Sequence, residues 1–126
     1  MKVTQNAEND FMNIMALIQC YFDGLYYGDV DKLTSIFHND AWLKSPGLRL
    51  SKKEWLANVA TRPIPADLKA EFAFKLLSID VIHDQASVKV ECPLFDYHYI
   101  DFLGLLKENG NWLIVNKMFT DISDKH

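Results

Sequence analysis

The chain has 126 residues, of which 49% are hydrophobic and 24% charged, and its formal net charge is −4. This length and composition predict one domain, residues 1–126, with a buried hydrophobic core. The acidic balance and the lack of a basic stripe argue against nucleic-acid binding. No apolar run approaches the roughly 20 residues that a membrane span needs.

Other classes are disfavoured by missing motifs. The start, MKVTQNAENDF, does not read as a signal peptide, so we expect a cytoplasmic protein. Cys20 and Cys92 lie far apart without CxxC spacing, which predicts reduced, buried thiols. The histidines show neither HxH nor HExxH spacing, and there is no glycine-rich phosphate loop. We therefore expect neither a metal ion nor a cofactor.

The first half of the chain predicts helices. Apolar residues at three- and four-residue steps predict a first amphipathic helix: Phe11, Ile14, Met15, Ile18, Phe22 and Leu25. Gly28 suits its end and Asp29 the cap of a second helix. A strand stopped by Pro46-Gly47 follows. Ser51 and Glu54 have the spacing of a capping box and open a third helix.

From Ala70 onward the apolar period is two, as in strands. The phase slips by one residue at Leu76-Leu77, which predicts a bulge that bends the sheet. A second alternating run from Ala86 to Cys92 is interrupted by Pro93. Asn109-Gly110 predicts a two-residue type I′ hairpin near the end of the chain.

This hairpin predicts which side chains face inward. Centring the turn on Asn109-Gly110 sets Gly104 opposite Val115 and Phe102 opposite Lys117 on the inner face. The other face is also apolar and carries Leu103, Leu105, Trp112, Ile114 and Met118. We expect this outer face to form a homodimer. The alternative is that the helices wrap further round the sheet and cover both faces.

Three segments carry a family resemblance: YFDGLYYGDVDKL, FHNDAWLKSPG and FLGLLKENGNWLIVNKMF. With the pattern between them, the chain resembles the nuclear transport factor 2-like superfamily, also called cystatin-like. Within it the chain is similar to the bacterial "putative lumazine-binding" group, close to SnoaL-like polyketide cyclases. The resemblance implies an α+β fold, in which three N-terminal helices pack on a strongly bent, mostly antiparallel sheet that forms a cone with an internal pocket. It identifies no activity, because the superfamily hosts isomerases, dehydratases, cyclases and binding proteins.

Ketosteroid isomerases of this superfamily allow a residue-by-residue comparison. Laid without gaps over residues 20–47, their oxyanion-stabilising tyrosine falls on Tyr21, which matches. Their general-base aspartate falls on Ser45 and their second acid on Phe102. Asp101 is one residue away, and we expect it on the opposite sheet face. Because that reaction needs these carboxyl groups, we do not expect it here.

Four polar residues are the candidates for orienting a ligand: Tyr21, Ser45, His98 and Lys117. Lys117 is predicted on the inner face, where an ammonium needs a partner. Asp96 or His98 would supply it if even-numbered side chains after Pro93 point inward. The candidate wall residues are Trp42, Trp55, Val88, Val90, Phe102, Val115 and Phe119. Each of these residues also has an ordinary structural interpretation, as core, turn or ion pair.

Two functions are compatible with this pattern. The first is binding of a small, partly apolar, ring-containing molecule, for which the resemblance implies lumazine. The alternative is an acid–base enzyme of the isomerase, dehydratase or cyclase type. It would use Asp96 or His98 as base and Tyr21 or Lys117 as acid. A third possibility is an accessory dimerisation unit whose cavity is collapsed.

Overall fold

The computed structural model describes residues 2–123, and their side chains from residue 8 onward. Within this range the chain forms three helices and six strands. The helices are α1 (Lys2–Tyr27), α2 (Val30–Ile36) and α3 (Lys52–Thr61). The strands are β1 (Phe37–Ser45), β2 (Leu48–Ser51), β3 (Lys75–Ile82), β4 (Gln85–Leu94), β5 (Tyr97–Glu108) and β6 (Asn111–Asp121).

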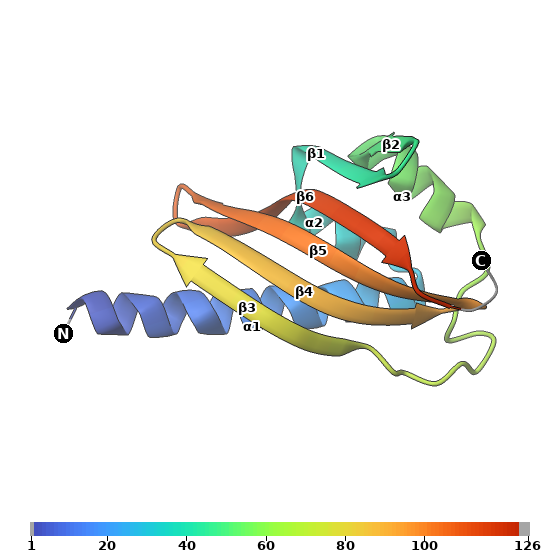
Figure 1. Cartoon of the computed structure of the whole chain (residues 1–126), viewed down its shortest axis with the longest axis horizontal. Helices are drawn as coiled ribbons and strands as arrows, with labels where there is room; N and C mark the ends of the chain where they lie inside the picture. The colour runs from blue at the N-terminus through green and yellow to red at the C-terminus, as the bar shows by residue number, and fades with distance from the viewer. Residues whose placement is uncertain (1, 124–126) are drawn as a thin grey trace.

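The strands form one sheet in the order β2-β1-β6-β5-β4-β3, in which only the β1–β6 pair is parallel among the described strands. Figure 1 shows the strands curving over α1, with α2 and α3 gathered at the end that carries β1 and β2. The core lies between the helices and one face of the sheet, here called the helix-covered face. The opposite face is called the outer face. The predicted α+β, cystatin-like fold class is confirmed.

The predicted helix ends are also confirmed. Gly28 has φ +60° directly after α1, and the side chain of Asp29 accepts a hydrogen bond from the Lys32 amide at the start of α2. Ser51 and Glu54 form the full capping box of α3. The face of α1 differs from the prediction toward its N-terminus, where Phe11 and Met15 are exposed. Leu17 and Tyr21 are buried instead, on the side that meets the sheet.

Two predicted features of the sheet are confirmed as well. The β3–β4 register shifts between Leu76 and Ser78, which is the bulge that the slipped apolar phase predicted. At the β5–β6 turn, Asn109 has φ +52° and Gly110 φ +81°, the pair of positive angles that a type I′ turn requires.

The prediction that even-numbered side chains point inward after Pro93 is wrong. Strand β4 continues through Pro93 to Leu94, and the chain reverses in a two-residue turn at Phe95 and Asp96. Leu94 therefore pairs with Tyr97, and each inward even-numbered residue of β4 pairs with an odd-numbered residue of β5. Val90 pairs with Asp101 and Cys92 with Tyr99, so odd-numbered side chains of β5 face the helices.

The predicted inner and outer faces of the last hairpin are also corrected. Leu105 pairs with Ile114, but Gly104 pairs with Asn116, so Val115 is an extra residue on β6. This bulge pairs Lys117 with Leu103 rather than with Phe102. Of the five residues predicted on the dimer face, four are buried under the helices and Met118 is 49% exposed. The buried four are Leu103, Leu105, Trp112 and Ile114.

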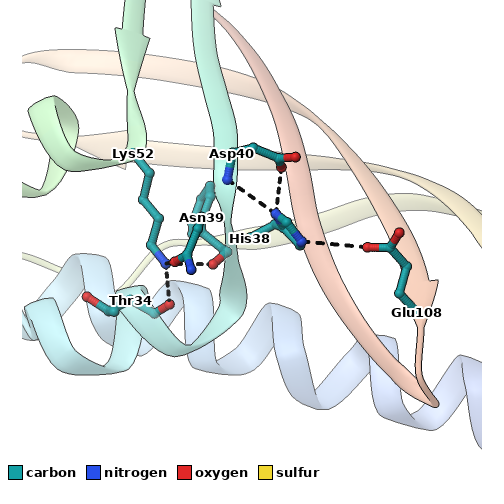
Figure 2. Close-up of polar contacts among 7 residues, drawn as sticks. Thr34, His38, Asn39, Asp40, Lys52 and Glu108 are labelled. Atoms are coloured by element: carbon teal, nitrogen blue, oxygen red, sulfur yellow. Dashed lines mark hydrogen bonds and ion pairs between the residues drawn. The ribbon is translucent and has the colours of Figure 1, made fainter.

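A buried lysine fastens α3 to the end of α2 and the start of β1 (Figure 2). Lys52 Nζ donates to the carbonyl oxygens of Thr34 (2.9 Å) and Phe37 (2.7 Å) and to Asn39 Oδ1 (3.2 Å). These contacts satisfy carbonyls at a helix C-terminus, where a positive charge is favourable. Burial lowers the pKa of Lys52 below its ordinary value.

Two further contacts tie distant segments to the β5–β6 hairpin. His38 lies between two carboxylates (Figure 2). Its Nδ1 is 2.6 Å from Asp40 Oδ1, and its Nε2 is 3.7 Å from Glu108 Oε1. On α1, Asp10 Oδ1 accepts hydrogen bonds from Lys107 Nζ (2.8 Å) and Trp112 Nε1 (3.1 Å). The N-terminal part of α1 is therefore anchored to the sheet by a largely buried carboxylate.

Candidate functional site

Three buried polar side chains meet under the helices. The hydroxyl of Tyr21 on α1 donates a hydrogen bond of 2.6 Å to Asp101 Oδ2 on β5. Lys117 Nζ on β6 lies 3.8 Å from the same oxygen, which is an ion pair without a close hydrogen bond. The side chains of Lys117 and Asp101 are 9% and 2% exposed. Charges so far from water require partners of opposite charge, and Lys117 and Asp101 are partners of each other.

Aromatic rings surround the ammonium of Lys117. Its Nζ lies 4.7 Å from the ring centre of Trp55, 5.3 Å from that of Tyr21 and 5.5 Å from that of Phe119. Ring faces attract a cation at these distances. The site is therefore a polar centre with flat apolar walls, contributed by α1, α3 and β6.

Burial determines the protonation of these groups. Desolvation, and then the charge of Asp101, raises the pKa of Tyr21 well above its ordinary value, so the phenol stays a donor. Desolvation also raises the pKa of the Cys92 thiol, which is a free, buried cysteine beside the cluster. Burial lowers the pKa of Lys117, and the neighbouring Asp101 opposes this effect.

Two buried polar atoms of the described residues have no hydrogen-bond partner: Asp101 Oδ1 and Arg62 Nη2. Arg62 follows α3, and its backbone amide donates to Asn58 at 3.0 Å. Its guanidinium lies 5.7 Å from the ring centre of Phe95. Burial raises the pKa of both Tyr21 and Tyr99, and the charge of Arg62 partly opposes this rise. An acceptor and a donor are thus left open beside the same cluster.

Several predicted site residues do meet here. Tyr21, Trp55, Lys117 and Phe119 surround the ammonium, as the contacts above show. Val88 and Val90 of β4 are fully buried in the adjoining core. These four polar and aromatic residues and two valines come from α1, α3, β4 and β6.

Other predicted site residues lie elsewhere. Asp96 is exposed in the β4–β5 turn. His98 points to the outer face, where its Nε2 lies 2.5 Å from Glu91 Oε2. Trp42 and Phe102 are 45% and 42% exposed, also on the outer face. His98 and Phe102 face outward because the even-numbered side chains of β5 point away from the helices. Trp42 faces outward because it alternates with the buried Ala41 and Leu43 of β1.

Ser45 and Val115 have structural roles. Ser45 Oγ donates to the Phe119 carbonyl at 2.9 Å and ties β1 to β6. Val115 is half-buried at the bulge. Sequence reasoning missed Asp101 and Arg62 as site residues. The alternation of β5 would have placed Asp101 beside Lys117, had the turn at Phe95-Asp96 been recognised. For Arg62 no comparable signal exists in the sequence.

The comparisons with known proteins agree with this architecture. Residues 9–120 match the family described as "Putative lumazine-binding". The chain belongs to this family. No curated protein matches the sequence. A nuclear transport factor 2-like protein of unknown function from Silicibacter pomeroyi is 24% identical, with a TM-score of 0.74, over 91% of this chain and 98% of its own.

Two further solved structures have the same fold as this lumazine-binding family member. A nuclear transport factor 2-like protein from Shewanella baltica has a TM-score of 0.77 at 17% identity, over 92% of this chain and 96% of its own. A protein with a cystatin-like fold from Caulobacter vibrioides has a TM-score of 0.62 at 19% identity, over 91% of each chain. At these identities the similarity establishes the fold. In the described part of the chain, no helix is both long and apolar enough for a membrane span.

The structure also bears on the isomerase comparison. Asp101, rather than Phe102, lies beside Tyr21, so the expectation that it faces the opposite side is wrong. Asp101 accepts from the phenol and faces an ammonium, which is the arrangement of a carboxylate. The isomerase mechanism instead needs a protonated acid that donates. Ser45, at the general-base position, offers a hydroxyl already bonded to the backbone.

The outer face carries an open groove of about 430 Å³ near the β1–β2 turn. Its lining residues are Lys44, Ser45, Pro46, Arg49, Phe102, Met118, Phe119 and Thr120. Arg49 is engaged there, because its Nη1 donates to the carbonyls of Ser45 and Leu48. Among these lining residues, only Phe119 also contacts the buried cluster, through the ammonium of Lys117.

Proposed function

We propose that the protein binds a small, partly apolar, ring-containing molecule at the cluster of Tyr21, Asp101 and Lys117. The observation that supports this is the pair of buried polar atoms without partners, Asp101 Oδ1 and Arg62 Nη2. Buried polar atoms in folded proteins are nearly always hydrogen-bonded, and an exception calls for an explanation such as a bound molecule. A ligand that both donates and accepts would satisfy the two atoms together.

The walls of the site suit a flat ring. Trp55 and Phe119 flank the ammonium of Lys117, and Phe95 lies against Arg62. A few polar groups converging among apolar and aromatic side chains are typical of small-molecule sites. The family description makes lumazine, a two-ring heterocycle with carbonyl and N–H groups, the first compound to test.

Calorimetric titration with lumazine and riboflavin tests this proposal. Tyr21→Phe and Lys117→Ala are expected to weaken binding, because each removes a group of the buried cluster. Tyr27→Phe and Lys89→Ala are the matched controls, since Tyr27 and Lys89 are exposed. Equal affinities in all four variants would place binding elsewhere, and circular dichroism would establish that each variant is folded.

An acid–base reaction with Asp96 or His98 as the base is not supported. His98 lies on the outer face beside Glu91, and Asp96 is in an exposed turn. Tyr21 lies on the helix-covered side, fully buried. A base must come within hydrogen-bond reach of the proton that it removes, so these residues cannot act on one small substrate together.

We further propose that two copies associate through the outer face. Three exposed apolar side chains lie there on neighbouring strands: Trp42 on β1, Phe102 on β5 and Met118 on β6. Met118 pairs with Phe102 in the sheet register, and Trp42 pairs with Asn116, two residues before Met118, so Trp42 lies diagonally across from Met118. Exposed apolar patches of this kind are typical of protein interfaces. Of the five residues that the sequence predicted for a dimer face, only Met118 belongs to this patch, since the other four are buried.

The free cysteines bear on where the protein works. Cys20 is half-buried and Cys92 buried, and both are unpaired. Disulfides are rare in cytosolic proteins because thiols are kept reduced there. We therefore propose a cytoplasmic location, which fractionation of cells expressing the tagged protein would test.

A further inference from the structure

The buried cluster contains one ion pair, Lys117 with Asp101, and beside it a cation, Arg62, that has no ion pair among the described residues. Lys117 and Arg62 contribute two positive charges, and Asp101 contributes one negative charge. The ammonium of Lys117 and the carboxylate of Asp101 are almost fully buried, and Arg62 Nη2 is buried without a partner. An uncompensated charge away from water is costly, so this arrangement calls for one more negative charge.

Among the described residues, no carboxylate forms an ion pair with Arg62. Tyr21, Tyr99 and Cys92 stay neutral, since burial raises the pKa of each above its ordinary value. The other carboxylates whose charges act on Cys92 and Tyr99 are Glu91, which pairs with His98, and Asp121. Asp121 Oδ1 accepts from the amides of His98 (2.9 Å) and Ser123 (3.0 Å), and its Oδ2 from Ser123 Oγ (3.0 Å).

The two cations also repel each other. Burial is the main cause that lowers the pKa of Lys117; Asp101 opposes it, and the charge of Arg62 adds to the lowering. Burial likewise lowers the pKa of Arg62 itself. An anion placed between them would relieve both effects, because it would give each cation a partner of opposite charge.

We propose that the molecule bound at this site is an aromatic or heteroaromatic monoanion that also carries a hydroxyl or N–H donor. This inference rests on the proposed function. The anionic group, a carboxylate or an ionised enol, would accept from Arg62 Nη2 and face Lys117. The guanidinium is well suited to this role, since it presents planar donors to a carboxylate. The donor of the ligand would meet Asp101 Oδ1, and its ring would lie against Trp55 and Phe119.

Matched pairs of probes test the charge directly in the unmodified protein. The first pair is para-hydroxybenzoate and para-hydroxybenzamide, and the second is hydroxynaphthoate and hydroxynaphthamide. Within a pair the size and the hydroxyl are the same, and an anionic carboxylate is replaced by a neutral amide that has one acceptor oxygen and an NH2 donor. We expect the carboxylate to bind at least about tenfold more tightly than its amide in calorimetric titration, as hydrogen bonds to charged groups imply.

Two arginine variants locate the source of this preference. Arg62→Gln is expected to remove most of the advantage of the carboxylate while changing the amide little. Arg62→Lys keeps a positive charge and should therefore retain part of the preference for the carboxylate over the amide. Arg49→Gln is the matched control, because the Arg49 guanidinium donates to backbone carbonyls at the β1–β2 turn.

The outcomes separate this inference from the proposed function. If carboxylate and amide bind equally and Tyr21→Phe weakens both, the site stands and the monoanion is refuted. If the carboxylate preference persists in Arg62→Gln but is lost in Arg49→Gln, the anion binds in the outer groove and the inference is wrong. If neither the probes nor lumazine bind, the proposed function fails and this inference fails with it.

Discussion

Tyr21 and Asp101, 80 residues apart in the sequence, are joined by a buried hydrogen bond of 2.6 Å from the phenol to Oδ2. The bond links the middle of α1 to β5, and Tyr21 is fully buried. Because Lys117 faces the same oxygen, this one carboxylate connects α1, β5 and β6. The core and the candidate site therefore share their central contact.

Removing the phenol should lower stability measurably. In Tyr21→Phe, Asp101 Oδ2 loses its only close donor among the described residues and keeps the ammonium at 3.8 Å. Hydrogen bonds to charged groups contribute about 1.5–3 kcal/mol, so we expect a loss of that size in the free energy of unfolding. Urea denaturation measures it, with Tyr27→Phe as the exposed control. A loss no greater than that of the control would mean that the bond contributes nothing net.

Lys52 offers a second test, independent of the candidate site. Lys52→Met keeps most of the side-chain length but leaves the carbonyls of Thr34 and Phe37 without their ammonium donor (Figure 2). We expect a loss of about 2–3 kcal/mol in the free energy of unfolding, since buried acceptors would lose a charged partner. Lys53→Met, at the neighbouring exposed position, is the control and should cost little. Equal effects of the two substitutions would contradict the fastening role of Lys52.

Local signals in the sequence predicted local structure well. The cap at Asp29, the capping box at Ser51, the bulge near Leu77 and the turn at Asn109-Gly110 all occur as predicted. Each depends on a backbone conformation or a short-range hydrogen bond that particular residue types favour. The helical apolar pattern around Tyr21 and the alternation of the last strand at Lys117 also predict that both side chains lie inside, and both are buried.

The other differences between prediction and structure depend on two features that are only weakly marked in the sequence. The β4–β5 reversal occurs at Phe95-Asp96, where Phe95 adopts φ +58°, a conformation that favours glycine or asparagine. The bulge at Val115 has no glycine or proline on β6 itself, and the one glycine beside it is Gly104 on the opposite strand. Each feature changes the strand register by one residue, which exchanges the two faces of a strand. For this reason the sequence predicts His98 inside and Asp101 on the opposite face, whereas the structure has Asp101 inside and His98 on the outer face. For the same reason it predicts Trp112 and Ile114 on the outer face, whereas both are buried.

Acid should weaken the anchor of α1 on the hairpin. The hydrogen bond from Lys107 is the main cause that lowers the pKa of Asp10, opposed by burial and aided by Trp112. A lowered carboxyl pKa stabilises the fold above the unfolded value of about 3.9 and loses this contribution as the pH falls through the folded value. Asp10→Asn should therefore be less stable than the wild type at pH 7, and the gap should close below about pH 4.

The readout for this anchor is the fluorescence of tryptophan during urea denaturation, since Trp112 donates directly to Asp10. Asp80→Asn, on the exposed side of β3, is the matched control and should show no such convergence with pH. A stability gap between wild type and Asp10→Asn that stays constant from pH 7 to about pH 3 would show that the ionised form of Asp10 is not what stabilises the anchor.

Charge on the outer face should separate the proposed dimer. The double variant Phe102→Lys with Met118→Lys adds two cations beside Lys44, on the register that joins β1, β6 and β5. Across a two-fold interface each new charge would lie near a copy of the same patch, where burial without a partner is costly. Analytical ultracentrifugation should show a dimer for the wild type and a monomer for the double variant. Leu77→Lys, at an exposed apolar residue of β3, is the control and should leave the dimer intact. A wild type that sediments as a monomer would contradict the dimer, and a double variant that remains dimeric would place the interface on another surface.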